Sequence, residues 1–176
     1  MIASLVHTLC ASDDEYAGRF GEYVELGGRA NPDSAFGSIG FFEEVSDQIT
    51  LKGGISFLAS ESFDDIFTGG NLDVQYSLGM RFSPFIGAGV FAGYSEEIVS
   101  AEDDNIDNDD DGFVDESGEE KSIVDDVIAS VYPEAGFHYW ITEEVKLAFS
   151  GKYHVVTEGR EYDFWIFSTS FNLSFK

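Results

Sequence analysis

The sequence predicts an all-β fold, a closed antiparallel up-and-down transmembrane β-barrel of about eight strands. Three observations lead to this prediction. From residue 19 onward, apolar and polar side chains alternate in one segment after another, which is the period of a β-strand. The segments are roughly 10–13 residues long, whereas globular strands are mostly about 5–6 residues and tilted strands of about 9–11 residues cross a bilayer. The connections are short at one end and mostly longer at the other, as in membrane barrels.

The expected strands occur in two groups that flank an acidic segment. The first group comprises residues 19–30, 34–43, 48–60, 71–82 and 84–94, and the second comprises residues 128–140, 144–156 and 163–175. The alternation is clearest in residues 71–82. Its apolar positions are Leu72, Val74, Tyr76, Leu78 and Met80. Because successive side chains point to opposite faces of a strand, each segment has one apolar and one polar face.

The connections between these strands have two characters. Short turns are expected at residues 43–47, 83–84 and 142–143, and longer connections at residues 60–70, 95–126 and 156–162. The first connection, near Asn31-Pro32-Asp33, is short and fits the alternation less well. Short turns on one side and long loops on the other are typical of an outer-membrane barrel with periplasmic turns and external loops.

The composition fits a single β-rich domain over residues 13–176. The 176 residues include 17 Phe, 8 Tyr and 19 Gly but only 3 Pro, a balance that favours strands with tight packing. No apolar run approaches the roughly 18 residues of a transmembrane helix. The formal net charge of −25 argues against nucleic-acid binding, which needs clustered Lys and Arg. The single cysteine, Cys10, allows no intrachain disulfide.

Alternation alone leaves open which face of each strand points outward. A membrane barrel turns its apolar face to lipid, whereas a soluble lipocalin-like barrel turns it toward an internal ligand. The polar face here consists of small polar residues and a few charges of both signs, which favours a lumen. Lumenal charges must pair, so we expect an ion-pair network that plugs the barrel, with a gated pore as the alternative. The expected lumenal charges are Glu25, Arg29, Lys52, Asp73, Arg81, Glu134, Lys146 and Lys152.

The connection at residues 95–126 is dense in negative charge. It contains fifteen acidic residues and one base, Lys121, so it carries −14 of the formal net charge of −25. Like charges at this density repel one another and resist burial, which predicts an exposed external loop. Such a loop is also a candidate surface for a partner.

A calcium-loop pattern lies inside this segment. Carboxylates at Asp107, Asp109 and Asp111 are followed by Gly112, whose sharp turn would bring the carbonyl of Phe113 inward, and Asp115 occupies the ninth position. The twelfth position, where a bidentate Glu is expected, is a glycine. The pattern resembles the short Asp-rich calcium loops of thrombospondin type 3 repeats, and of EF-hands in its first half. The expected ligands of a structural Ca²⁺ are Asp107, Asp109, Asp111, Phe113 and Asp115. The alternative is a solvated acidic loop without a specific ion.

The first twelve residues are apolar and uncharged, ending in the small pair Ala11-Ser12. This pattern predicts residues 1–12 to be the remnant of a secretory signal peptide whose basic start lies upstream. An ordinary apolar N-terminal strand is the alternative.

The chain ends in a strand with alternate apolar residues, Phe171, Leu173 and Phe175, followed by Lys176. With the strand count and the loop alternation, this ending resembles the small outer-membrane β-barrel proteins of Gram-negative bacteria, over roughly residues 19–176. In that family the terminal strand ends in Phe and is read by the outer-membrane assembly machinery, so Lys176 departs from the pattern. The resemblance implies a bacterial outer-membrane location, contacts with lipid and with that machinery, and a non-enzymatic, surface or porin-like role.

Enzymatic activity is the main alternative function within that class, since some small outer-membrane barrels modify lipids with a Ser, a His and an acid. The histidines are His7, within the expected signal remnant, and His138 and His154 on the expected lumenal parity. A histidine within a strand is more often a satisfied polar residue than a base. We therefore expect no catalytic residues. A Ser, a His and a carboxylate meeting at a lipid-exposed rim would favour the enzyme.

Overall fold

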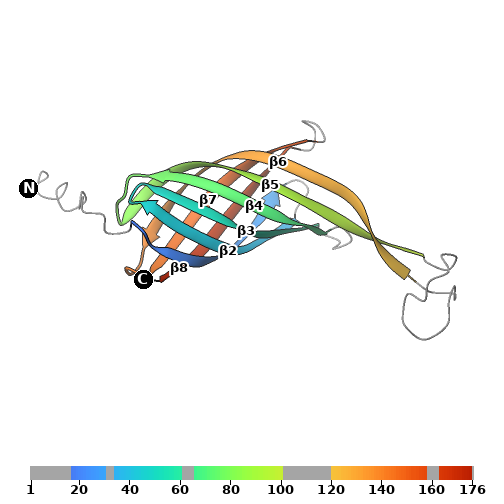
Figure 1. The fold of residues 1–176 in the computed structure, drawn as a ribbon. Helices are drawn as coiled ribbons and strands as arrows, with labels where there is room; N and C mark the ends of the chain where they lie inside the picture. Colours follow the sequence, from blue (N-terminus) through green and yellow to red (C-terminus); the bar gives the residue numbers. More distant parts are fainter. Residues whose placement is uncertain (1–16, 31–33, 61–65, 101–119, 158–162, 176) are drawn as a thin grey trace, which may run out of the picture.

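The computed structural model describes residues 17–30, 34–60, 66–100, 120–157 and 163–175. Within these ranges, eight strands close into one antiparallel barrel in which each strand pairs with the next and β8 pairs with β1 (Figure 1). The predicted fold class is therefore confirmed. The strands are β1 Phe20–Ala30, β2 Ser34–Ser46, β3 Ile49–Ser60, β4 Ile66–Ser77, β5 Phe82–Ser100, β6 Glu120–Trp140, β7 Val145–Val156 and β8 Phe164–Phe175. In these ranges no helix is long and apolar enough to cross a membrane.

The apolar face of each strand points outward and the polar face points into the barrel. On β4, Leu72 is 66% exposed and Val74 is 46% exposed, whereas their neighbours Asn71 and Asp73 are buried. Every other strand also exposes large apolar side chains on its outer face. A soluble barrel would not expose a continuous apolar wall of this kind, so the lipocalin-like alternative is wrong.

The turn between β4 and β5 lies earlier than predicted. β4 spans Ile66–Ser77 and β5 begins at Phe82, so the chain reverses at residues 78–81 and not at residues 83–84. Gly79 adopts a positive φ of 65°, and the amide of Leu78 donates to the Ser83 hydroxyl at 2.8 Å. Apolar and polar residues keep alternating through the turn, so periodicity alone hid the reversal, whereas a glycine that tolerates positive φ marks it.

β5 and β6 extend well into the acidic segment that was expected to be a loop. β5 continues to Ser100 and β6 starts at Glu120, with pairing from Ser95 opposite Asp126 to Ser100 opposite Glu120. The flanks of residues 95–126 are therefore strands. They contain β-branched residues, which favour extended structure despite the neighbouring charges.

The two ends of the barrel differ, but less than the loop alternation predicted, because β4 begins at Ile66 and shortens the connection expected at residues 60–70. The start of β1 and the end of β8 lie at one end, together with the short turns after β2, β4 and β6 (Figure 1). The connections at residues 31–33, 61–65, 101–119 and 158–162 join strands at the opposite end and lie outside the described residues, as does the expected signal remnant at 1–12. We call these the turn end and the loop end.

Candidate functional site

The charged side chains inside the barrel form the most distinctive site of the molecule. Six of the eight charges predicted to be lumenal are buried there, each less than 7% exposed. They are Glu25, Lys52, Asp73, Glu134, Lys146 and Lys152. Their strands alternate small and polar residues on the inner face, which leaves room for long side chains to meet near the barrel axis.

Glu25 on β1 is the centre of the first ion-pair cluster. One carboxylate oxygen lies 2.8 Å from Lys152 Nζ, and the other lies 3.4 Å from Lys52 Nζ. The Ser168 hydroxyl also donates to this carboxylate. Lys152 Nζ lies 4.0 Å from a carboxylate oxygen of Glu134. The other oxygen of Glu134 accepts a hydrogen bond from the Gln75 amide at 2.8 Å. The predicted pairing of lumenal charges is therefore confirmed here.

Asp73 on β4 anchors a second, mostly hydroxyl-rich cluster. It accepts hydrogen bonds from the Tyr132 hydroxyl and from the Asn71 amide, both at 2.7 Å. Asn71 in turn lies within hydrogen-bond distance of the hydroxyls of Tyr23, Ser38 and Ser56. The Tyr132 ring lies over Gly89 on β5, where an added Cβ would meet that ring at 2.5 Å. A glycine at this position is what allows Tyr132 to reach Asp73.

A third cluster lies nearer the turn end and includes a residue that sequence reasoning missed. Glu44 pairs with Lys146 and accepts a 2.6 Å hydrogen bond from Thr50. Lys146 also lies over the rings of Phe42 and Trp140, at 4.9 and 5.2 Å. Glu44 was assigned to a turn because the expected strand ended at residue 43. The sequence signal that could have placed it is Val45, which continues the outward apolar parity of Ile39 and Phe41 and so puts Glu44 on the inward parity.

Two of the predicted lumenal charges behave differently. Arg81 lies in the turn between β4 and β5, where its guanidinium donates to the backbone carbonyls of Trp140 and Ile141. Its lumenal assignment was wrong because the predicted strand ran too far. Arg29 is half-buried near the loop end, and its guanidinium carbon lies 4.2 Å from the centre of the Phe164 ring.

Near the loop end, the interior becomes aromatic and apolar. The His154 ring stacks on Tyr132 at 4.2 Å and on Phe164 at 4.8 Å between ring centres. A cluster of buried apolar side chains packs around Phe164. Its members are Phe36, Leu58, Ile128, Val156, Phe164 and Ile166. The barrel is therefore filled by ion pairs at mid-height and by apolar groups toward the loops.

The structure also brings together a Ser–His pair that the sequence did not reveal. Ser130 Oγ lies 2.8 Å from His154 Nδ1, because the two residues sit on the neighbouring strands β6 and β7. His154 Nε2 has no hydrogen-bond partner among the described residues, so no carboxylate orients the ring from its other side. The pair is buried within the barrel and does not lie on the lipid-exposed rim. Among the residues that the structure describes, no acid completes the Ser, His and carboxylate set that nucleophilic catalysis commonly uses.

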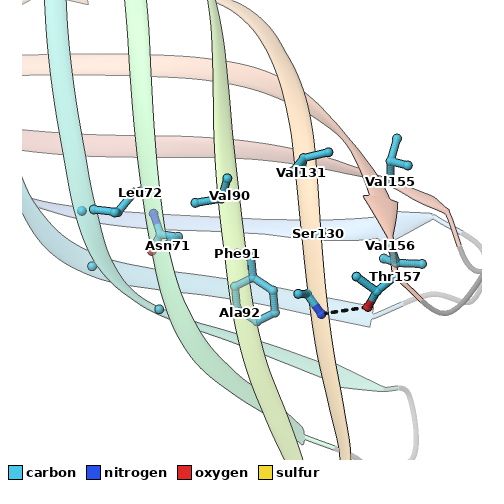
Figure 2. Close-up of a pocket in the computed structure, with 14 residues that line it drawn as sticks. Asn71, Leu72, Val90, Phe91, Ala92, Ser130, Val131, Val155, Val156 and Thr157 are labelled. Carbon is cyan, nitrogen blue, oxygen red and sulfur yellow. Dashed lines mark hydrogen bonds between the residues drawn. The ribbon is translucent and has the colours of Figure 1, made fainter.

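A groove of about 720 Å³ runs over the outer surface of β3 to β7. Figure 2 shows Leu72, Val90 and Val131 on successive strands of its lining. Ala129 N donates to Thr157 Oγ1 at 3.3 Å at one edge of the groove. None of the residues that line it is titratable, and most are apolar or glycine, so the groove forms part of the apolar exterior.

The expected calcium ligands lie outside the described residues, since positions 107–115 fall in the range 101–119. Among the residues that the structure does describe, no group of three or more His, Cys, Asp or Glu side chains is arranged to hold a metal ion.

An eight-stranded antiparallel barrel with an apolar exterior and a paired, charged interior has the architecture of a transmembrane β-barrel. No model of a protein family matches the sequence, and no curated protein matches it. Among solved structures, the N-terminal β-barrel domain of Pseudomonas aeruginosa OprF aligns with a TM-score of 0.60 and 17% identity, over 90% of this chain and 98% of that one. A structure described as de novo design of transmembrane β-barrels aligns with a TM-score of 0.47 and 14% identity, over 89% and 97%. The similarity to the OprF domain shows a shared fold.

Proposed function

We propose that this chain is a non-enzymatic bacterial outer-membrane barrel that anchors an acidic external segment and does not conduct solutes. The observation that carries this proposal is the barrel interior, where buried charges of opposite sign are matched across the lumen. The similarity in fold to the OprF barrel domain supports an outer-membrane location for this chain.

The pairing inside the barrel favours a plug over an open pore. Glu25, Lys52 and Lys152 come from three different strands and are each less than 7% exposed, as is Glu134. A water-filled channel would leave such groups solvated, as in large porins. Buried charges are stable only when they are paired and hydrogen-bonded, and this network meets that condition.

Membrane fractionation and electrical recording test this proposal together. The expressed protein should enter the outer-membrane fraction and migrate differently in gels before and after boiling, as folded barrels of this type do. In planar bilayers the parent protein should show no steady conductance. Glu25→Ala removes the side chain that Lys52 and Lys152 both contact. Glu22→Ala is the control, because it changes an exposed residue of the same strand. Steady conductance by the parent protein would contradict the plug.

The outward apolar residues of β8 support delivery by the outer-membrane assembly machinery. Phe171, Leu173 and Phe175 all lie on the outer face of β8 and are between 37% and 48% exposed. Deleting Phe175 and Lys176 should reduce the fraction of folded barrel in the outer membrane.

We further propose that the acidic segment binds one Ca²⁺ through Asp107, Asp109, Asp111 and the Phe113 carbonyl, with Asp115 direct or through water. The sequence spacing supports this site, and the glycine at the twelfth position argues for weak affinity, on the order of 10⁻⁴–10⁻³ M. Mg²⁺ should bind less well because it requires stricter octahedral geometry. Calorimetry on Asp109→Ala and Asp111→Ala decides the matter: calcium binding equal to that of the parent chain in both variants would rule the site out.

A further inference from the structure

β5 and β6 continue past the rest of the barrel as a two-stranded ribbon (Figure 1). Among the described residues, β4 pairs with β5 only as far as Tyr94, and β7 pairs with β6 only as far as Ser130. Beyond these positions β5 and β6 pair with each other, out to Ser100 opposite Glu120. At about 3.3 Å per residue, residues 95–100 extend roughly 20 Å. The ribbon therefore projects from the loop end.

A β-bulge marks the point where the ribbon leaves the barrel wall. Ser95 lies opposite Asp126 and Glu96 lies opposite Val124, so Asp125 is the additional residue on β6. A bulge bends the strand that contains it and increases its local twist. The change of register thus lies at the junction between the closed barrel and the ribbon.

Within the part of the chain that the structure describes, the ribbon has an edge on each side, unlike the closed barrel. In an antiparallel pair, about half of the backbone N–H and C=O groups of each strand point away from the partner strand. Along residues 97–100 of β5, the only strand partners among the described residues are on β6. Such an edge can accept an additional strand through backbone hydrogen bonds.

The charge of the ribbon selects what can pair with that edge. Residues 95–100 and 120–127 contain five acidic residues and one base, a formal net charge of −4, and the intervening residues 101–119 add ten more acidic residues. A second copy of the chain would bring the same negative charge, so self-pairing is disfavoured. The only base, Lys121, is on β6, whereas residues 95–100 of β5 carry Glu96 and Glu97 and no base. The β5 edge therefore favours a cationic strand.

We propose that the β5 edge of the ribbon, residues 97–100, docks an extended Lys/Arg-rich segment of a partner protein by strand addition. Backbone hydrogen bonds supply the pairing, and the acidic surroundings attract the cationic segment and exclude like-charged strands. The bound segment would extend the two-stranded ribbon to three strands, which are more stable than an isolated pair. The proposal concerns the ribbon alone and holds whichever membrane contains the barrel.

Peptide binding to the intact protein in detergent micelles tests the proposal. A fluorescent peptide of alternating Lys and Val should bind in the presence of a chelator, and its affinity should fall about tenfold or more from low to high salt. The same peptide with alternate backbone amides N-methylated keeps its charge but loses donors on one edge, so it should bind at least about tenfold more weakly. Glu96→Gln combined with Glu97→Gln should weaken binding several-fold. Glu22→Gln combined with Glu43→Gln, a matched change on exposed positions near the turn end, should not.

Three results would overturn the proposal. Equal binding of the N-methylated peptide would mean that charge alone attracts the ligand. Equal binding of an alternating Glu and Val peptide would mean that the edge has no charge preference. Self-association of the parent protein that the cationic peptide does not compete away would make a second copy the occupant. Unboiled gel migration verifies that every variant contains a folded barrel.

Discussion

At the scale of single residues, Glu25 is a carboxylate that contacts two buried lysines of the interior network. It lies on β1 and connects to Lys52 on β3, Lys152 on β7 and Ser168 on β8. Each of these groups has been removed from water, so the stability of the network depends on charge matching and on complete hydrogen bonding. The loss of a central carboxylate leaves two buried lysines without their nearest counter-charge.

Glu25→Gln should therefore destabilise the folded barrel strongly. Breaking a buried ion pair by removing one partner costs about 3–5 kcal/mol. Glu22→Gln is the matched control, because Glu22 is exposed on the same strand and such changes usually lie within about 0.5 kcal/mol. Urea unfolding in lipid vesicles measures both variants. Similar unfolding midpoints for the two would mean that the network contributes little to stability.

Gly89→Ala tests the packing that lets Tyr132 reach Asp73. An added Cβ would meet the Tyr132 ring at 2.5 Å, so the ring must move and its 2.7 Å hydrogen bond must lengthen. Overpacking of this kind typically costs about 1–3 kcal/mol. At Gly37 the nearest atom to an added Cβ is 3.9 Å away, so Gly37→Ala should be tolerated. Thermal unfolding measures the loss of stability in both variants. A larger loss for Gly37→Ala than for Gly89→Ala would refute the packing of Tyr132 over Gly89.

At the scale of strands, the sequence predicted the number, order and inward face of the strands, because period-two alternation records which side of each strand meets lipid. It did not locate every reversal. Residues 78–81 continue the alternation through a turn, and this single misplacement moved Arg81 into the expected lumen. The Ser130–His154 pair could not be predicted either, since it depends on the register between β6 and β7. Periodicity carries no information about that register.

The β6–β7 ladder contains a local weakness at Pro133. Pairing passes from Val131 opposite Val155 directly to Glu134 opposite Lys152, and omits the two positions between them. Proline has no N–H to donate to a neighbouring strand. Pro133→Val should restore a ladder hydrogen bond and raise stability by about 0.5–1.5 kcal/mol. Hydrogen exchange at Tyr153 and His154 should slow in this variant. Unchanged exchange would show that the gap has another cause.

At the scale of the whole molecule, the barrel has an apolar exterior that meets lipid, paired charges inside, and a two-stranded ribbon that projects from the loop end. Leu72 lies near the middle of β4 with its side chain outward. Leu78 directly follows β4, in the turn at the turn end of the barrel. Both are leucines more than half exposed. They differ in their expected depth within a bilayer.

The most direct measurement is the free energy of folding into lipid bilayers for Leu72→Arg and Leu78→Arg. An arginine at the bilayer midplane of a barrel costs about 2–4 kcal/mol, and one near the interface costs about 0–1 kcal/mol. The larger loss is expected at Leu72 and the smaller loss at Leu78. Equal losses at the two positions, or no loss at Leu72, would contradict a barrel that spans the membrane in this orientation.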